Sequence, residues 1–303
     1  MSASTKNLKT FTIQDSDYCF DSILRVKQDI IIVKQLNDAE KLSSKAAENL
    51  KKISDFFEGI PIVIVDKVQG EKLPDDIVYS KHNIPVMTSE TYSKMLKGSD
   101  EPLIYVSRGG IYVKIKKEAL REKREKSGYS RGELAHRLGI SRRAVLYYES
   151  GISDASLNVA AKLEEIFGEE IFEKMSINSL KRMFREKIFE EYSHTRSIAR
   201  DDIIRFVLNM FAQLGFKDYI FYKTPFDAGA KSMKKRKVKV IIEKEEEKED
   251  IGTIEEIIKV TESTAIIISN NIEGEQITDK YMIVPSSRIS KIKEKVKILL
   301  NEL

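Results

Sequence analysis

Several residue types that build reactive sites are scarce in this sequence, which has one cysteine, three histidines and no tryptophan. The single cysteine, Cys19, excludes a disulfide within the chain, and no Cys/His cluster offers a zinc site. His82, His136 and His194 lie far apart along the chain, which argues against a histidine-based metal or catalytic site. We therefore expect neither a metal nor a cofactor.

Long apolar runs are also missing. No stretch of about eighteen apolar residues occurs, so the sequence predicts no membrane-spanning helix and no membrane partner. The N-terminus lacks the charged-then-apolar pattern of a secretory signal, and we expect a cytoplasmic protein. Abundant Lys, Glu and Ile without Trp fit a heat-adapted source. The length of 303 residues indicates two or three domains.

Residues 127–151 have the pattern of two short helices joined by a tight turn. Ser130 is a typical N-cap, and Glu133 three residues later completes a capping box. The first helix is expected over 131–138, and Gly139 ends it because glycine tolerates a positive φ.

The second helix is expected over 142–149, with Ser141 as its N-cap and Gly151 at its end. Val145 and Tyr148 fall on one side of this helix and are predicted to face the core. Four residues are left for its outer side: Arg142, Arg143, Leu146 and Tyr147.

Helical patterns on both sides of this pair indicate a small all-α domain, long enough for five short helices over 117–172. Its residues resemble those of the Cro/repressor-type helix-turn-helix family. The matching positions are Leu120, Arg121, Arg124, Glu133, Leu134, Ala135, Leu138, Gly139, Ile140, Ser141, Val145, Tyr148, Glu149 and Gly151. Many relatives carry Gln where this chain has Arg131, and both side chains can contact a phosphate.

The resemblance implies that this segment binds double-stranded DNA through a helix-turn-helix that extends from about Gly128 to Tyr147, with the second helix in the major groove. Arg142 and Arg143 stand at the front of that helix, where base edges are met first. Ser141 and Tyr147 are weaker candidates for a base or a phosphate. Three further residues are expected to hold phosphates and set the register: Lys126, Arg131 and Arg137.

The charge distribution favours a polyanionic partner over a purely structural bundle. Residues 117–151 contain nine Lys or Arg and five Glu, and the difference of +4 equals the formal net charge of the whole chain. The alternatives are that this bundle binds a protein instead of DNA, and that individual arginines are ordinary solvated charges.

The regions on either side of the helix-turn-helix follow the same pattern of strand, helix, strand, strand and helix. Each begins with a Phe-Asp pair, at 20–21 and at 226–227. The first copy is expected to contain strands at 30–33, 62–65 and 86–87 and helices at 46–57 and 89–96. The second is expected to contain strands at 240–242, 265–268 and 282–284 and helices at 254–260 and 286–300. We interpret them as two copies of one small α/β domain.

Both copies resemble the restriction-endonuclease or resolvase-like fold. That family places one acid before an acid-x-Lys motif, and the acids hold a divalent metal. Asp21 and Lys34 match in the first copy, and Asp227 and Lys244 match in the second. The second acid is missing, because Ile32 and Ile242 take its place, and strand alternation directs Glu243 to the other face. The pattern therefore implies the fold more than the activity, and no catalytic residue is predicted.

Two joining pieces complete the chain. Residues 103–115 alternate as a β-hairpin that turns at 107–110, where Gly109 and Gly110 permit the tight bend. The hairpin is interpreted as a dimerisation edge, a DNA-contacting wing with Arg108 at its tip, or a spacer. Residues 176–200 have a helical pattern with one apolar face, typical of a connecting or dimer helix.

The whole arrangement resembles an archaeal family of helix-turn-helix transcriptional regulators, and we expect a multidomain α/β plus all-α fold. The predicted divisions are an N-terminal α/β domain (1–98), the hairpin (99–116), the helix-turn-helix domain (117–173), a connecting helix (174–200) and a C-terminal α/β domain (201–303). The leading hypothesis is a sequence-specific, dimeric, non-enzymatic DNA-binding regulator with an unidentified effector. The alternatives are a metal-dependent nuclease or a protein-binding scaffold.

Overall fold

The computed structural model describes residues 8–13, 17–183, 201–232, 239–245, 251–292 and 296, and it gives no side-chain description for residues 243–245. Contacts divide the chain into two compact units. One unit comprises Met1–Gln35, Leu42–Ile62 and Arg185–Leu303, and the other comprises Leu36–Lys41 and Val63–Phe184. No helix among the described residues is long and apolar enough to cross a membrane.

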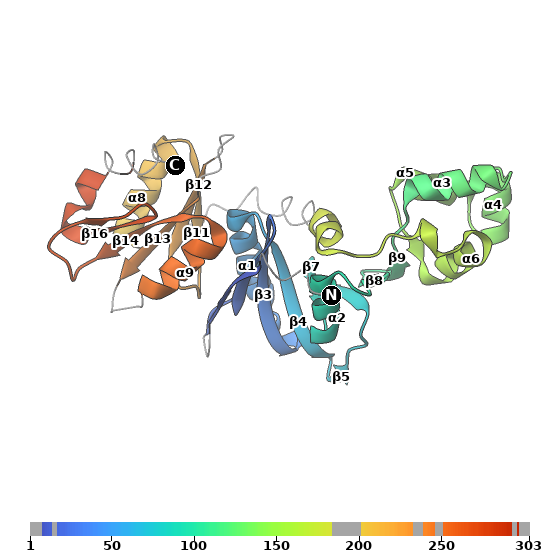
Figure 1. Ribbon diagram of the computed structural model, residues 1–303, viewed down its shortest axis with the longest axis horizontal. Coiled ribbons are helices and arrows are strands. Elements are labelled where there is room, and N and C mark those ends of the chain that lie inside the picture. The colour runs from blue at the N-terminus through green and yellow to red at the C-terminus, as the bar shows by residue number, and fades with distance from the viewer. Residues whose placement is uncertain are drawn as a thin grey trace. The chain divides into compact units, whose positions relative to one another are not determined.

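Two mixed β-sheets form the α/β parts of the described chain (Figure 1). The strands of the first sheet are β1 (Leu8–Thr12), β2 (Ser22–Val26), β3 (Asp29–Asp38), β4 (Ile60–Val68), β5 (Glu71–Lys72), β6 (Ile77–Lys81), β7 (Ile84–Met87), β8 (Ile104–Ser107), β9 (Gly110–Val113) and β10 (Ala155–Ser156). Their order is β1-β2-β3-β4-β7-β6-β8-β9-β10, with β5 paired to β4. The expected strands at 30–33, 62–65 and 86–87 all lie within this sheet.

The second sheet has the order β11-β12-β13-β14-β16-β15. Its strands are β11 (Phe216–Ile220), β12 (Ala228–Ser232), β13 (Lys239–Glu245), β14 (Thr264–Ser269), β15 (Gln276–Ile277) and β16 (Tyr281–Pro285). The strands β11, β12 and β13 run antiparallel, whereas β13, β14 and β16 run parallel. Parallel strands of this kind are buried on both faces, which explains the unbroken apolar run in β14.

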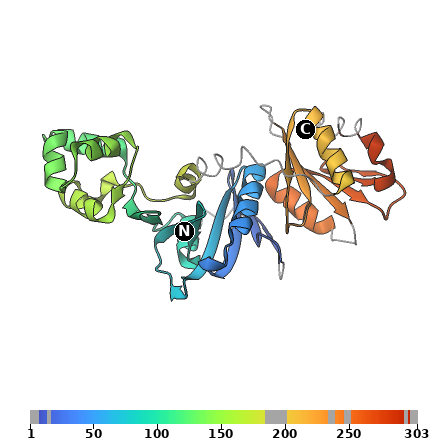
Figure 2. The same cartoon turned by 180° about the vertical axis from the view of Figure 1, so that it is seen from behind.

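Helices pack on both sheets because each α-helix has an apolar side that it buries. In the N-terminal α/β part these are η1 (Ala39–Lys41), α1 (Ser44–Phe57) and α2 (Ser89–Lys97). In the C-terminal α/β part they are α8 (Asp202–Gln213), α9 (Ile251–Thr261) and the 3-10 helix η3 (Ser286–Lys291). The helix α8 lies against one face of the second sheet (Figure 2). Its buried residues share a core with Ala228, Ala230 and Val240 of that sheet. The helix predicted at 286–300 is a 3-10 helix over its first six residues, and most of its remainder lies outside the described residues.

The helix-turn-helix segment comprises α3 (Lys117–Lys126), α4 (Arg131–Leu138), α5 (Arg142–Ser150), α6 (Leu157–Phe167) and the 3-10 helix η2 (Glu169–Ile171). Four α-helices and a single 3-10 turn therefore occupy this described span, for which five short helices were predicted. They share a core with the hairpin strand β9, through Leu120, Leu134, Val145 and Leu163, all of them fully buried.

The predicted hairpin is formed by β8 and β9, whose antiparallel register pairs Ser107 with Gly110. Its outer edges are occupied: β8 runs parallel to β6, and β9 pairs with β10 at Tyr112 and Val113. This favours the spacer interpretation over a free dimerisation edge. In the helical segment predicted at 176–200, residues 177–183 are helical, and residues 184–200 lie outside the described part.

Candidate nucleic-acid interface

The structure forms the two helices predicted for the motif, and the approximate limits of the motif, Gly128 and Tyr147, lie in the turn before α4 and within α5. Gly128 lies before the first helix of the motif, in the turn that closes α3. Its φ is 74°, its N–H donates to Glu125 O at 3.0 Å, and α4 begins three residues later, at Arg131. A glycine in the left-handed region ends a helix and does not start one. The helix α5 continues past Tyr147 to Ser150, one residue beyond the predicted end at 149. The two helices of the motif therefore span residues 131–150.

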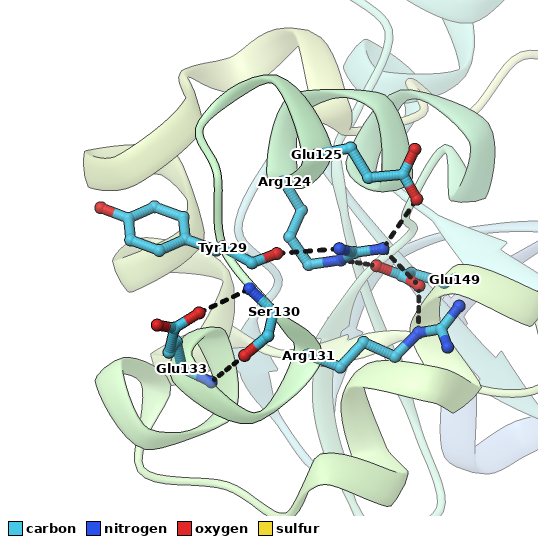
Figure 3. Close-up of polar contacts among 7 residues, drawn as sticks. All are labelled: Arg124, Glu125, Tyr129, Ser130, Arg131, Glu133 and Glu149. Carbon is cyan, nitrogen blue, oxygen red and sulfur yellow. Dashed lines mark hydrogen bonds and ion pairs between the residues drawn. The ribbon is translucent and has the colours of Figure 1, made fainter.

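The first helix of the motif begins with the predicted capping box (Figure 3). The Glu133 backbone N–H donates to Ser130 Oγ at 3.2 Å, and the Ser130 N–H donates to Glu133 Oε2 at 2.7 Å. The second of these hydrogen bonds lowers the pKa of the exposed Glu133 carboxyl. The start of α4 is thus fixed by two reciprocal hydrogen bonds between residues three apart.

The turn between α4 and α5 uses glycine where the backbone is left-handed. Gly139 has a φ of 70°, and its N–H donates to carbonyls of the last turn of α4. Ile140 follows, half-buried against the core, and its N–H donates to Ala135 O at 3.0 Å. Ser141 then caps α5, since the Ala144 N–H donates to Ser141 Oγ at 3.1 Å. Local hydrogen bonds therefore set the crossing of the two helices.

The two faces of α5 differ in exposure as helical spacing predicts. Val145 is fully buried and Tyr148 is 7% exposed, whereas Leu146 is 43% exposed. Arg142 and Arg143 lie in the first turn and are exposed. The front of the helix therefore presents two exposed guanidinium groups.

A buried ion-pair network joins the three helices α3, α4 and α5 (Figure 3). Glu149 in α5 has a side chain that is 0% exposed, and it binds Arg124 of α3 and Arg131 of α4. The distance from Arg131 Nε to Glu149 Oε2 is 2.7 Å. Burial alone would raise the pKa of Glu149, but hydrogen bonds from Arg124 and Arg131 outweigh it, and the pKa is lowered. The carboxylate is therefore held ionised between two cations.

This network was not predicted from the sequence, in which Arg124 and Glu149 were named only as positions that match the family and as members of the charge count. Arg131 was predicted to hold a phosphate. Its Nε binds Glu149, and its side chain remains 34% exposed. Arg124, which also donates to Tyr129 O at 2.9 Å, is buried. The sequence signal for this network was that Arg124 and Glu149 both lie near the C-terminal end of a predicted helix.

Two other predicted contact residues are restrained by aromatic neighbours. Arg143 Nε donates to Tyr147 Oη at 2.5 Å, and its guanidinium lies 5.1 Å from the centre of that ring. Arg137 lies 4.7 Å from the centre of the Tyr129 ring. Lys126 is exposed and 3.6 Å from Glu122 in a weak surface pair. Each guanidinium is thus partly restrained, while the Lys126 ammonium is not.

In the N-terminal α/β part, the predicted Asp21–Lys34 pair is formed. Lys34 Nζ lies 2.8 Å from Asp21 Oδ1 and also donates to Tyr18 O at 2.9 Å. The other oxygen, Asp21 Oδ2, accepts the Gln35 N–H at 2.5 Å. Ile32, at the position of the second acid, is fully buried. These residues do not fit a divalent metal, because one carboxylate is engaged at both oxygens and the second is absent.

The strand register does not place Lys244 at the position that corresponds to Lys34, although the sequence pattern predicted that match. The Asp21 N–H donates to Val33 O, and the Asp227 N–H donates to Ile242 O. The residue after the acceptor is Lys34 in the first copy and Glu243 in the second, so Lys244 lies one position further on. Among the described residues, no group of three His, Cys, Asp or Glu side chains could hold a metal ion.

Two segments of this chain match models of known protein families. Residues 4–102 match the model of the PD-(D/E)XK superfamily domain, and residues 120–174 match the helix-turn-helix model. A protein of Methanocaldococcus jannaschii named "Putative HTH-type transcriptional regulatory protein" is 32% identical over 233 residues, which cover 77% of this chain and 70% of that protein. The chain belongs to this family.

Other archaeal members of the family have the same name. The Pyrococcus furiosus protein is 29% identical over 94% of this chain and 89% of its own length. The Thermoplasma acidophilum protein is 30% identical over 83% and 78% of the two chains. No solved structure matches this chain. This chain therefore combines a PD-(D/E)XK superfamily domain with a helix-turn-helix, as the motifs predicted.

Proposed function

We propose that this protein is a sequence-specific DNA-binding transcriptional regulator that reads the major groove with α5. One observation carries the proposal: the first turn of α5 exposes Arg142 and Arg143 within a capped helix-turn-helix. A bidentate arginine contact with guanine discriminates between bases by about 1–3 kcal/mol. The family name, which denotes transcriptional regulation, supports the same function.

The remaining predicted residues fix the position of that helix on the duplex. Arg131, Arg137 and Lys126 contact phosphates, and their charges give binding its salt dependence. Ser141 and Tyr147 lie beside the two arginines and contact either a base or a phosphate. The buried Glu149 carboxylate orients Arg131, because a hydrogen bond at Nε leaves the outer face of the guanidinium for a phosphate.

One helix-turn-helix reads too few base pairs for useful selectivity, and we propose that the protein binds as a homodimer in the cytoplasm. A two-fold dimer places its two reading helices about 34 Å apart, one turn of duplex. The preferred sites would then be palindromic.

A selection from a random duplex library tests this function. Wild-type protein should enrich one palindromic sequence, and Arg142→Ala/Arg143→Ala should lose that preference. Arg121→Ala, an exposed arginine of α3, is the matched control and should retain it. Full affinity and unchanged preference in the double variant would refute the assignment of α5. Binding without any salt dependence would favour a protein-binding scaffold.

We also infer that the α/β parts at 1–98 and 201–303 are repeats of one domain on either side of the hairpin (99–116), the helix-turn-helix (117–173) and a connecting segment (174–200). The support is topological. The order β11-β12-β13-β14-β16-β15 matches β1-β2-β3-β4-β7-β6 strand for strand. The helices α1 and α9 both precede a buried strand and both end at a glutamate with positive φ, Glu58 (60°) and Glu262 (52°).

A metal-dependent nuclease is the second candidate, favoured by the Asp21–Lys34 pair inside a PD-(D/E)XK domain. The missing second carboxylate weighs against it, and we propose that the protein is not an enzyme. Duplex, flap and junction DNA with Mg²⁺ or Mn²⁺ provide the test. Cutting that Asp21→Ala or Asp227→Ala abolishes would establish the nuclease.

A further inference from the structure

The two α/β repeats contact each other through corresponding elements. The helix α1 of the N-terminal repeat packs on β12 of the C-terminal repeat, and α9 of the C-terminal repeat packs on β1 and β2 of the N-terminal repeat. In the shared strand order, α1 corresponds to α9, and β1-β2 corresponds to β11-β12. The contact is therefore reciprocal at the level of whole elements.

The strand registers extend the correspondence to single residues of the hairpins. Ser22 pairs with Val33 in the first repeat, and Ala228 pairs with Ile242 in the second. Counting three residues along each strand from Ser22 and Ala228 reaches Arg25 and Lys231, so these two cations occupy equivalent positions. Both are buried, at 8% exposure each.

Each of these cations donates to the end of the helix in the opposite repeat. Lys231 Nζ lies 2.5 Å from Asp55 O in the last turn of α1. Arg25 Nε lies 2.7 Å from Val260 O in the last turn of α9, and Arg25 Nη1 lies 3.1 Å from Glu262 Oε2. The last carbonyls of a helix carry a partial negative charge and attract cations, and Asp55 O accepts from Lys231 in addition to the Glu58 N–H at 3.3 Å. Both contacts thus place a cation against the C-terminal end of a helix in the opposite repeat.

The first of the two contacts carries an additional buried carboxylate. Asp55 Oδ1 lies 3.1 Å from Lys231 Nζ, and its Oδ2 accepts from Lys217 Nζ and Tyr219 Oη at 2.8 Å each. Burial opposes ionisation, yet these partners lower the pKa of Asp55. Removing one partner would leave a buried charge without compensation, which destabilises the contact.

Shape complements these charges. Gly229 stands two residues before Lys231 on the same face of β12, and a Cβ there would lie 2.6 Å from a carbon of the Phe56 ring. Phe56 is fully buried and contacts the rings of Tyr219 and Phe221. Lys239 Nζ, also at this face, donates to Thr261 O at 3.4 Å. A phenyl ring of α1 therefore fills the space that the absent side chain of β12 leaves.

We infer that the two repeats form an internal pair related by a two-fold axis. In each repeat, the first hairpin and the long helix form a surface, and the same surface of the other repeat covers it. The partner of the N-terminal endonuclease-like domain is thus the C-terminal domain of the same chain. An isologous interface of this kind uses the same patch on both members, and its use within one chain leaves none of that patch for a second chain. This inference rests on the repeat relationship and is independent of DNA reading by α5.

A protease site inserted in the full-length chain between residues 192 and 193 allows a direct test. After cleavage, the two pieces should co-elute in size-exclusion chromatography at micromolar concentration. Lys231→Glu and Arg25→Glu should each raise the dissociation constant at least tenfold, because the positions are equivalent. Lys231→Met, which keeps much of the apolar stem, should raise it less than Lys231→Glu and guards against misfolding of the reversed variant.

Lys280→Glu, an exposed lysine of the C-terminal repeat, is the matched control and should leave the pieces together. Pieces that separate in the wild type would overturn the inference, as would an unchanged dissociation constant in both charge-reversed variants. The DNA-library selection on the uncut protein is a separate readout. Separation of the wild-type pieces with an intact sequence preference of the uncut wild type would refute the internal pair alone. Wild-type pieces that stay together, with no sequence preference in the uncut wild type, would refute only DNA reading.

Discussion

Arg131 donates a hydrogen bond of 2.7 Å from Nε to Oε2 of Glu149, which lies 18 residues further along the chain on another helix. The same carboxylate binds Arg124 of α3. One acidic group at the end of the proposed reading helix therefore holds both neighbouring helices. The orientation of α5 and the position of Arg131 depend on it together.

Replacing Glu149 with alanine should destabilise the helix-turn-helix unit by about 3–5 kcal/mol, because two guanidinium groups would lose a buried partner. Hydrogen exchange of the α4 and α5 amides measures this locally. Glu118→Ala is the control, since Glu118 is exposed and 3.5 Å from an exposed Lys117, and it should change stability by about 0–1 kcal/mol. Equal protection in both variants would contradict the role assigned to Glu149.

The same pair predicts an acid-sensitive unit. The pKa of Glu149 is lowered in the folded protein, so its stabilisation is fully present above the unfolded pKa of about 4.3. It is lost as the pH falls through the lower, folded pKa, because the unfolded state then binds more protons. Glu149→Gln cannot titrate, and its α4 and α5 protection should fall less steeply with acid than that of the wild type. Identical slopes would show that other carboxylates dominate.

The helix-turn-helix could be predicted because its determinants are local. Ser130, Glu133, Gly139 and Ser141 all act within four residues of their partners, and each forms the cap or turn that was expected. The outer face of α5 followed from helical spacing alone. Short-range hydrogen bonds and periodicity are visible in a sequence.

The features that could not be predicted depend on distant residues or on register. Arg25 reaches Val260 across 235 positions, and no local pattern announces such a contact. The sequence pattern matched Lys34 with Lys244, which is one residue away from the position that corresponds in the strand register. The match failed because β3 and β13 are apolar on both faces beside this position. Without alternation, nothing in the sequence fixes the strand register.

The proposed division between base-reading and phosphate-holding residues predicts two kinds of variant. Lys126→Ala and Arg137→Ala should weaken binding to all sequences alike, and each should reduce the slope of affinity against salt by about 0.9. Arg142→Ala should cost about 1–3 kcal/mol on the preferred site and relax its sequence. Titrations on preferred and scrambled duplexes at several salt concentrations separate the two effects. A change of preference in Lys126→Ala would reverse its assignment.

Gly229 offers a steric test of the packing between α1 and β12. A methyl group at this position would meet Phe56 ring carbons at 2.6 and 2.7 Å, and the ring is enclosed by Phe57, Tyr219 and Phe221. Because packed cores do not yield freely, Gly229→Ala should lower the free energy of unfolding by about 1–3 kcal/mol.

Two companion variants decide whether the clash with Phe56 is the cause. Gly274→Ala is the matched control, since no atom lies within 4 Å of a Cβ there and no positive φ is involved, and urea unfolding should be nearly unchanged. Phe56→Leu is destabilising alone, because it removes a buried ring. In combination with Gly229→Ala it should cost less than the sum of the two single changes, since the shorter side chain makes room for the methyl group. Strict additivity would place the strain of Gly229→Ala elsewhere in β12.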